Sequence, residues 1–232
     1  MVRDILHHVS LLVIESPDKK EILIGKYDDT YPLEVFRNRV NLIGGNQHPE
    51  DSSPHELLKR EIIEEFSIRK KAEGKIEESI SRTSGKGMGA PLPSKYASEE
   101  DIIKIKNEIL KFKPYGDFIV NVPYIKKFPL ETVAIYSLFY ITLPKDLFEC
   151  ARINLSEGRS IKSEGFAAIV SIEDLKNGEP LSAGATPLVL SHYLKTQIPD
   201  PYGLKGDFIG MPRAKLSDYD KDYKTTNVIR KQ

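Results

Sequence analysis

Three glutamates stand within five consecutive residues of this chain, at Glu61, Glu64 and Glu65. On an α-helix, Glu61 and Glu65 lie one turn apart, and Glu64 falls within the same third of the circumference. Like charges at this spacing repel one another by roughly a few tenths of a kcal/mol. A divalent cation would offset that repulsion, because hard ions such as Mg²⁺ prefer carboxylate oxygens and keep waters that a phosphate can displace. The spacing therefore indicates a metal site.

The residues before the glutamates predict the helix that positions them. Ser53 is the expected N-cap, Pro54 occupies the first helical position, and Glu56 completes a capping box with Ser53. An apolar stripe that would pack against a core follows at Leu58, Ile62 and Phe66. The helix is thus expected to present its carboxylates at the edge of its packed face.

A glycine pair, Gly44 and Gly45, directly follows a strand predicted at residues 40–43. Glycine permits a sharp turn and lets the backbone approach a ligand closely. Strand, glycine turn, loop and capped helix therefore form one continuous unit that ends near residue 68.

Further strands are predicted on both sides of this unit. Segments 8–14 and 21–26 flank a turn at Ser16-Pro17-Asp18, which indicates a hairpin. Segment 133–143 is apolar on both faces, as is typical of a central strand. The other predicted elements are strands at 118–120 and 166–170, a short helix from 171 to about 177, and a helix at 186–195.

Residues 69 to about 116 interrupt the strand pattern. A glycine-rich loop at 84–93 and a second capped helix that begins after Ser98 indicate an inserted helical hairpin. The chain becomes polar and rich in glycine after Pro199, so we expect residues 200–232 to form a C-terminal arm or tail. Residues 1–199 would then form one domain that carries the insertion.

The composition narrows the class of protein. Lys plus Arg equals Asp plus Glu at 34 each, so no overall charge attracts nucleic acid or a membrane, although a local basic groove stays open. The longest apolar run, 133–143, is too short to span a bilayer. The N-terminal residues do not show the basic-then-apolar pattern of a secretory leader, so we expect no secretory signal. The single cysteine, Cys150, fits a reducing compartment, so we expect a cytoplasmic protein.

The stretch Arg60-Glu61-Ile62-Ile63-Glu64-Glu65-Phe66-Ser67-Ile68 resembles the end of the Nudix box, G-x5-E-x7-R-E-U-x-E-E-x-G-U, where U is a bulky aliphatic residue. Three features depart from that pattern. Ser67 replaces a glycine, Ser52 stands where the upstream glutamate belongs, and the segment from Gly45 to Arg60 is one residue too long. The resemblance covers about 1–68 and 117–196. It implies an α+β fold, an α/β/α sandwich with a mixed β-sheet.

The resemblance also implies roles for the box residues. Glu61, Glu64 and Glu65 would bind Mg²⁺ or Mn²⁺, and the Gly45 carbonyl would add a ligand. The metal would neutralise a diphosphate and lower the pKa of a bound water. Asp51 or Glu50 could replace the missing glutamate as a further metal ligand.

Other candidate residues lie on both sides of the metal ligands. Arg60 would orient a helix glutamate through a charge-assisted bond. In this family a general base can come from the box, here Glu64, or from a later loop, for which Glu164 is the candidate. Arg37 and Arg39 could contact a phosphate or a base, and the alternative is that they are surface residues that favour solubility.

These observations favour a Mg²⁺-dependent hydrolase that cleaves a phosphoanhydride bond in a nucleoside diphosphate linked to another group. One alternative is a Nudix-fold module that binds a nucleotide or a protein partner without cleavage, since the front of the box is irregular. A further alternative is RNA cap or 5′-end hydrolysis with the insertion facing RNA. A homo-oligomer is compatible with all three hypotheses.

Overall fold

The described part of the chain comprises residues 3–31, 34–68, 93, 95–121, 132–163 and 165–225 of a computed structural model. Its strands are β1 (Arg3–Glu15), β2 (Glu21–Lys26), β3 (Val40–Asn41), β4 (Ile43–Asn46), β5 (Lys113–Asn121), β6 (Thr132–Thr142), β7 (Phe166–Ser171), β8 (Gly206–Gly210) and β9 (Tyr223–Thr225). Its α-helices are α1 (Pro54–Glu65), α2 (Glu99–Ile109), α3 (Lys145–Ser156), α4 (Ile172–Asn177) and α5 (Thr186–Leu194). Two 3₁₀-helices, η1 (Glu34–Phe36) and η3 (Leu216–Lys221), complete the described elements.

The nine described strands form one mixed sheet in which the main strand order is β3-β2-β1-β6-β5-β8. β4 and β9 also pair with β1, and β7 pairs with β2. β1 runs parallel to β6 and β9, while its pairings with β2 and β4 are antiparallel. The expected hairpin is present, and β6 lies between β1 and β5 as the predicted central strand.

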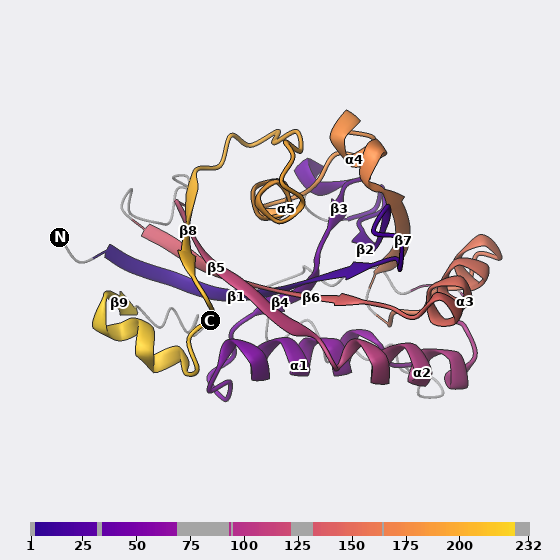
Figure 1. Cartoon of the computed structure of the whole chain (residues 1–232), viewed down its shortest axis with the longest axis horizontal. Helices are drawn as coiled ribbons and strands as arrows, with labels where there is room; N and C mark the ends of the chain where they lie inside the picture. Colours follow the sequence, from indigo (N-terminus) through magenta and orange to yellow (C-terminus); the bar gives the residue numbers. More distant parts are fainter. Residues whose placement is uncertain are drawn as a thin grey trace.

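Helices cover both faces of the sheet (Figure 1). Leu12 and Ile14 of β1 belong to a core shared with α1, α2 and α3, whereas Leu11 and Val13 belong to a core shared with α5. The alternation follows from the two-residue period of a strand, which sends neighbouring side chains to opposite faces. This arrangement confirms the predicted α/β/α sandwich with a mixed sheet.

The inserted segment is described only in part. α2 begins after Ser98, whose Oγ accepts a hydrogen bond from the Asp101 N–H at 3.1 Å, as the capping pattern predicts. β5 begins at Lys113, so the strand pattern resumes a few residues before the predicted end of the insertion. The first half of the predicted helical hairpin, including the loop at 84–92, lies outside the described residues.

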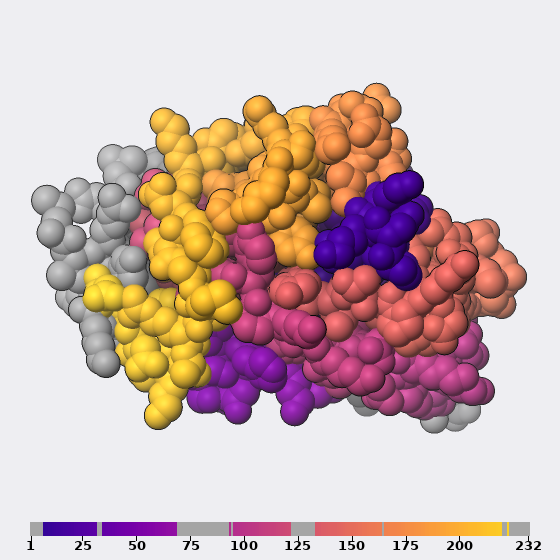
Figure 2. Space-filling model, in the orientation of Figure 1, coloured from indigo at the N-terminus to yellow at the C-terminus, as the bar shows by residue number. Residues whose placement is uncertain are grey.

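The C-terminal residues pack against the sheet. β8 pairs with β5, and β9 pairs with β1. Tyr219 of η3 is fully buried, and its hydroxyl donates a hydrogen bond to the buried Asp117 carboxylate. Figure 2 shows this segment in yellow beside the purple surface of α1. The Leu216 N–H donates a 2.9 Å hydrogen bond to the carbonyl of Ser52, which lies just before α1. The domain boundary at 199 stays a prediction.

Candidate functional site

The local sequence of α1 determines where the helix begins and how it packs on the sheet. The Ser53 Oγ accepts a hydrogen bond from the Glu56 N–H at 3.1 Å, and Pro54 is the first helical residue. The Pro54 carbonyl accepts a 2.8 Å hydrogen bond from the buried Ser10 hydroxyl of β1. Buried side chains anchor the rest of the helix at Leu57, Leu58 and Ile62. The carboxylates of α1 therefore take their places relative to β1 and β4.

The glycine pair in β4 brings the backbone against α1. Gly44 has a φ of +137°, and a Cβ there would collide with the Ser10 carbonyl oxygen of β1. A Cβ at Gly45 would collide with the carboxylate of Glu61. Only glycine fits at Gly45 while Glu61 keeps this position, so the pair lets the backbone pack directly on the Glu61 carboxylate. The predicted close approach to a ligand stays a prediction.

Arg60 is the centre of a polar network next to this turn. Its Nε and Nη2 lie 3.1 and 2.9 Å from the two carboxylate oxygens of Asp51, a bidentate arrangement. Its Nη2 also donates to the Asn46 carbonyl at 2.9 Å. Its Nη1 donates to Glu61 Oε1 at 2.8 Å and lies 3.4 Å from Glu64 Oε2. Arg60 thus orients a helix glutamate in the structure, while its part in catalysis stays a prediction.

The lengthened loop places Asp51 beside Arg60. Asp51 is buried, and its Oδ2 also accepts a 2.7 Å hydrogen bond from the His48 N–H. Ser52 bonds instead to Glu56, and Glu50 is exposed with its carboxylate 3.4 Å from His48 Nδ1. Both oxygens of Asp51 are engaged by Arg60, so Asp51 positions the arginine. Its predicted role as a metal ligand remains untested.

Glu61 has an unusual electrostatic environment. Burial raises the pKa of its carboxyl to about 7, although the Arg60 charge opposes this shift. Glu65 and Glu64 add to the rise through their negative charges. The ionised form of Glu61 is therefore costly near neutral pH, and a bound cation would favour it.

Glu65 lies at the other end of the cluster against a lysine that the sequence analysis did not single out. Lys162 Nζ is 2.5 Å from Glu65 Oε2, and both side chains are at least nine-tenths buried. The Gly44 N–H lies 3.4 Å from Glu65 Oε1. Nothing near Lys162 in the sequence reveals this contact, because the two residues meet only through the tertiary fold.

The exposed side of α1 borders a cavity of about 330 Å³. Its lining includes Arg60 and Glu64 together with Glu56, Lys59 and Ile63. The Glu64 side chain is about half-exposed, so it lies between the Arg60 network and this cavity. The cavity offers space for a ligand next to two of the predicted site residues.

The donor types at this site suit a hard divalent cation. Glu61 and Glu64 supply carboxylates that share one guanidinium nitrogen of Arg60, and the close packing of Gly45 on Glu61 brings main-chain groups near. Mg²⁺ is commonly held by one or two carboxylates, with waters and substrate phosphates as its other ligands. Within the described residues, however, no group of three His, Cys, Asp or Glu side chains is arranged to hold an ion. The described carboxylates alone therefore do not form a three-ligand site, and metal binding by Glu61 and Glu64 stays a prediction.

The remaining predicted residues lie away from this network or outside the described residues. Glu164 is outside them, so its predicted role as a base stays a prediction. The Arg37 Nε donates to the Tyr31 carbonyl at 2.8 Å, and the Arg39 guanidinium lies over the Tyr202 ring at 5.2 Å. Their predicted contacts with substrate are not tested by these interactions.

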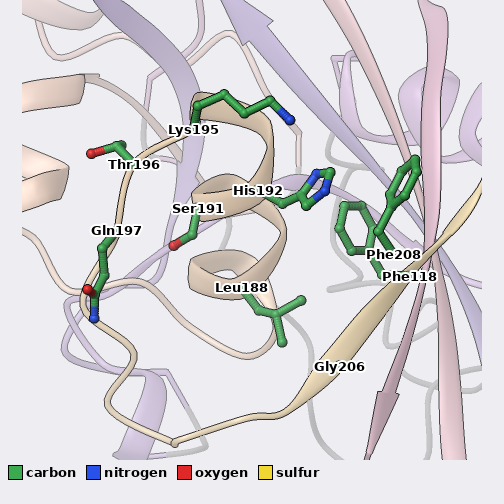
Figure 3. Close-up of a pocket in the computed structure, with 9 residues that line it drawn as sticks. All are labelled: Phe118, Leu188, Ser191, His192, Lys195, Thr196, Gln197, Gly206 and Phe208. Atoms are coloured by element: carbon green, nitrogen blue, oxygen red, sulfur yellow. The ribbon is translucent and has the colours of Figure 1, made fainter.

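A second cavity, of about 510 Å³, lies between α5 and the strands β5 and β8 (Figure 3). His192 points from α5 toward Phe208 and Phe118, and its ring stacks on Phe208 with 4.7 Å between centroids. The Tyr115 hydroxyl holds the other side of the imidazole, 2.9 Å from Nδ1. None of the predicted site residues lines this cavity.

In the described residues, no helix is long and apolar enough to cross a membrane.

No family model matches the sequence, and no curated protein matches it. Among solved structures, the fold is similar to a Nudix hydrolase from Nitrosomonas europaea at 13% identity, over 84% of this chain and 93% of that one, with a TM-score of 0.38. A mutT/nudix family protein from Listeria innocua is 13% identical over 82% of this chain and 92% of that one, with a TM-score of 0.39.

A bifunctional NMN adenylyltransferase/ADP ribose pyrophosphatase from Francisella tularensis is 12% identical, with a TM-score of 0.38. That match covers 82% of this chain but only 41% of the bifunctional protein, which has also been solved with AMP and a manganese ion. At TM-scores of 0.38 and 0.39 these matches say nothing about the chemistry of the site, which has to be argued from the residues around Arg60.

Proposed function

We propose that this protein is a divalent-metal-dependent hydrolase that cleaves a phosphoanhydride bond in a nucleoside diphosphate linked to another group. The observation that carries the proposal is the Arg60 network, which holds Glu61 against Gly45 and extends to Glu64 at the edge of a cavity. Carboxylates next to a glycine turn and an open cavity suit the binding of a diphosphate through a metal ion.

Each residue of the network has a distinct part in this proposal. Glu61 and Glu64 would hold Mg²⁺ or Mn²⁺, with the Gly45 carbonyl as a further ligand. The ion would neutralise the diphosphate and lower the pKa of a bound water. Arg60 keeps Glu61 in one orientation, and Asp51 keeps Arg60 in place through two hydrogen bonds. Glu64, which is half-exposed, would accept a proton from the attacking water, with Glu164 as the alternative base.

The substrate would be a nucleotide-type small molecule, and Arg39 is the better of the two candidate contacts for it. The Arg39 guanidinium stacks on Tyr202, and the nearby rings of Tyr27 and Phe36 lie parallel with 5.9 Å between centroids. Phe36 in turn meets Tyr202 edge-on with 5.9 Å between centroids, so Arg39 lies beside a cluster of aromatic rings on which a base could stack. Arg39→Met is expected to raise KM for a nucleotide substrate and to leave kcat nearly unchanged.

The test is turnover by the purified protein with Mg²⁺ of nucleotide sugars, dinucleotides, nucleoside triphosphates and capped RNA. Glu61→Gln and Glu64→Gln are expected to lower kcat by at least about a hundredfold, the usual scale for loss of a group that acts in the transition state. Glu173→Gln on α4, an exposed glutamate 3.6 Å from Lys176, is the matched control and should leave turnover unchanged. Absence of turnover, together with no effect of either substitution on metal binding, would refute the proposal.

A binding module without catalysis is the second candidate. The contacts of Asp51 with Arg60 and of Glu65 with Lys162 favour it, because each engages a carboxylate that the sequence analysis offers as a metal ligand. Tight nucleotide binding without hydrolysis would support this candidate. Capped RNA stays in the substrate panel as the third hypothesis, and a cytoplasmic location and a homo-oligomer remain predictions from the sequence.

A further inference from the structure

Lys162 is the least expected charge in the site. Its side chain is only 7% exposed, and its ammonium meets Glu65 Oε2 at 2.5 Å. A buried ammonium is costly unless it is paired, so this contact accounts for the burial of both groups. A Cβ built at Gly25 of β2 would stand 3.1 Å from Nζ, which shows that the strand leaves space for the ammonium by having no side chain there.

The backbone around Lys162 is fixed to α1. The Ser163 N–H donates to the Glu65 carbonyl at 2.6 Å, and the Ser163 hydroxyl donates to the Glu64 carbonyl at 2.7 Å. The Ser67 hydroxyl donates to the same Glu64 carbonyl at 2.8 Å, so the serine that replaces the box glycine takes part in this junction. These bonds satisfy carbonyls at the end of the helix and hold Lys162 next to Glu65.

We propose that the Lys162 ammonium is a built-in cation for Glu65, so that a divalent ion in this site is held by Glu61 and Glu64 and not by Glu65. The proposal rests on the metal site of the proposed function and specifies its ligands. It departs from the box pattern, in which all three glutamates would bind metal. The basis is steric and electrostatic: one carboxylate oxygen at 2.5 Å from an ammonium has no space for a second cation on the same side.

Displacement of the lysine by a metal would be expensive. The ammonium would have to remain in a buried place without its partner, because the bonds of Ser163 to α1 keep the backbone from moving away. Glu61 and Glu64, in contrast, share only the Arg60 Nη1, and Glu64 faces the cavity. A cation that enters from the cavity therefore meets Glu64 first, and Glu61 lies on the same guanidinium nitrogen as Glu64.

The test is a titration of the full-length protein with Mn²⁺, in which free Mn²⁺ is measured by electron paramagnetic resonance and thermal unfolding is followed in parallel. Lys162→Met frees Glu65, so we expect Mn²⁺ to bind at least about tenfold more tightly and to raise the Tm of this variant more than that of the wild type. The double variant Lys162→Met/Glu65→Met removes both buried charges and should bind Mn²⁺ within about threefold of the wild type. Lys104→Met, which removes an exposed lysine from α2 away from the cavity, is the charge control and should change Mn²⁺ affinity by less than about threefold.

Two results would overturn the proposal: unchanged Mn²⁺ affinity in Lys162→Met, or a double variant that binds Mn²⁺ at least about tenfold more weakly than the wild type. If Lys162→Met does not fold, the comparison of the double variant with the wild type decides alone, because only a wild type that already uses Glu65 would lose affinity. Metal binding is read without turnover. Absence of turnover with the whole substrate panel would therefore count against the proposed activity alone. The Mn²⁺ titration would still decide the assignment of Lys162.

Discussion

The bond between Arg60 and Asp51 is the contact on which the geometry of the site depends most, and its loss has a predictable cost. The Asp51 side chain is only 4% exposed and that of Arg60 is 17% exposed. Removal of one partner from a buried ion pair costs about 3–5 kcal/mol, because the other charge stays buried without compensation. Arg60→Met should therefore lower the free energy of unfolding by about 3 kcal/mol, near the lower end of that range because the guanidinium keeps some contact with water.

The double variant Arg60→Met/Asp51→Leu provides the sharper measurement. It leaves no uncompensated carboxylate at position 51, so we expect it to be about 1–2 kcal/mol more stable than Arg60→Met alone. Urea unfolding of the wild type, both single variants and the double variant gives the complete cycle. The same experiment reads out the site, because Glu61 loses its 2.8 Å hydrogen bond whenever Arg60 is replaced.

Arg152→Met is the matched control for this cycle. Arg152 also binds a distant carboxylate through two nitrogens, with its Nη1 3.0 Å from Glu21 Oε1, but its side chain is 38% exposed. An exposed pair contributes at most about 1 kcal/mol, so this variant should cost clearly less than Arg60→Met. A cost below about 1 kcal/mol for Arg60→Met, or a double variant that costs the sum of the two single changes, would refute the reasoning.

Three further predictions test other parts of the molecule. Burial lowers the pKa of His8 to about 4, so the unfolded chain binds more protons than the folded protein between about pH 4 and 6.5. The free energy of unfolding should therefore fall by about 2 kcal/mol from pH 7 to pH 5. Urea unfolding of His8→Gln should show little of this pH dependence. Gly45→Ala pushes a methyl group into the Glu61 carboxylate and should weaken Mn²⁺ binding by about tenfold, while the circular dichroism spectrum stays that of the wild type. Tyr219→Phe removes the hydrogen bond to the buried Asp117 and should cost about 2 kcal/mol in urea unfolding, whereas Tyr202→Phe, which removes an exposed bond, should cost under about 1 kcal/mol.

The part of the site that could be predicted from the sequence is the part that depends on neighbours along the chain. The cap at Ser53, the proline at the start of α1 and the position of Arg60 beside Glu61 and Glu64 are all consequences of helical geometry. The central position of β6 and the hairpin of β1 and β2 follow from apolar patterning and turn residues in the same way. Local periodicity specified these elements well.

Contacts between distant segments could not be predicted in this way. Lys162 reaches the end of α1 on a segment that is 99 residues away in the sequence, counted between the hydrogen-bonded Ser163 and Glu64. Tyr219 is buried against Asp117 across 102 residues, although its surroundings are charged and polar in the sequence. The sequence analysis did not predict α3 either. Its N-cap is Pro144, which follows β6, and its apolar residues Phe148 and Ala151 belong to the core.

The charges of the site lead to one more quantity that can be measured. Four carboxylates surround the helix end, and two cations are built into the protein: Arg60 is bidentate to Asp51, and Lys162 is paired with Glu65. Glu61 and Glu64 have between them only one nitrogen of the same Arg60, so one further divalent ion would neutralise the charge that remains. Burial of Glu61, which raises its pKa to about 7, makes a bound ion more favourable because the ion stabilises the ionised carboxylate. We therefore expect one Mn²⁺ per chain at saturation in the absence of nucleotide, and a titration that ends at two or more tightly bound ions would contradict this account of the charges.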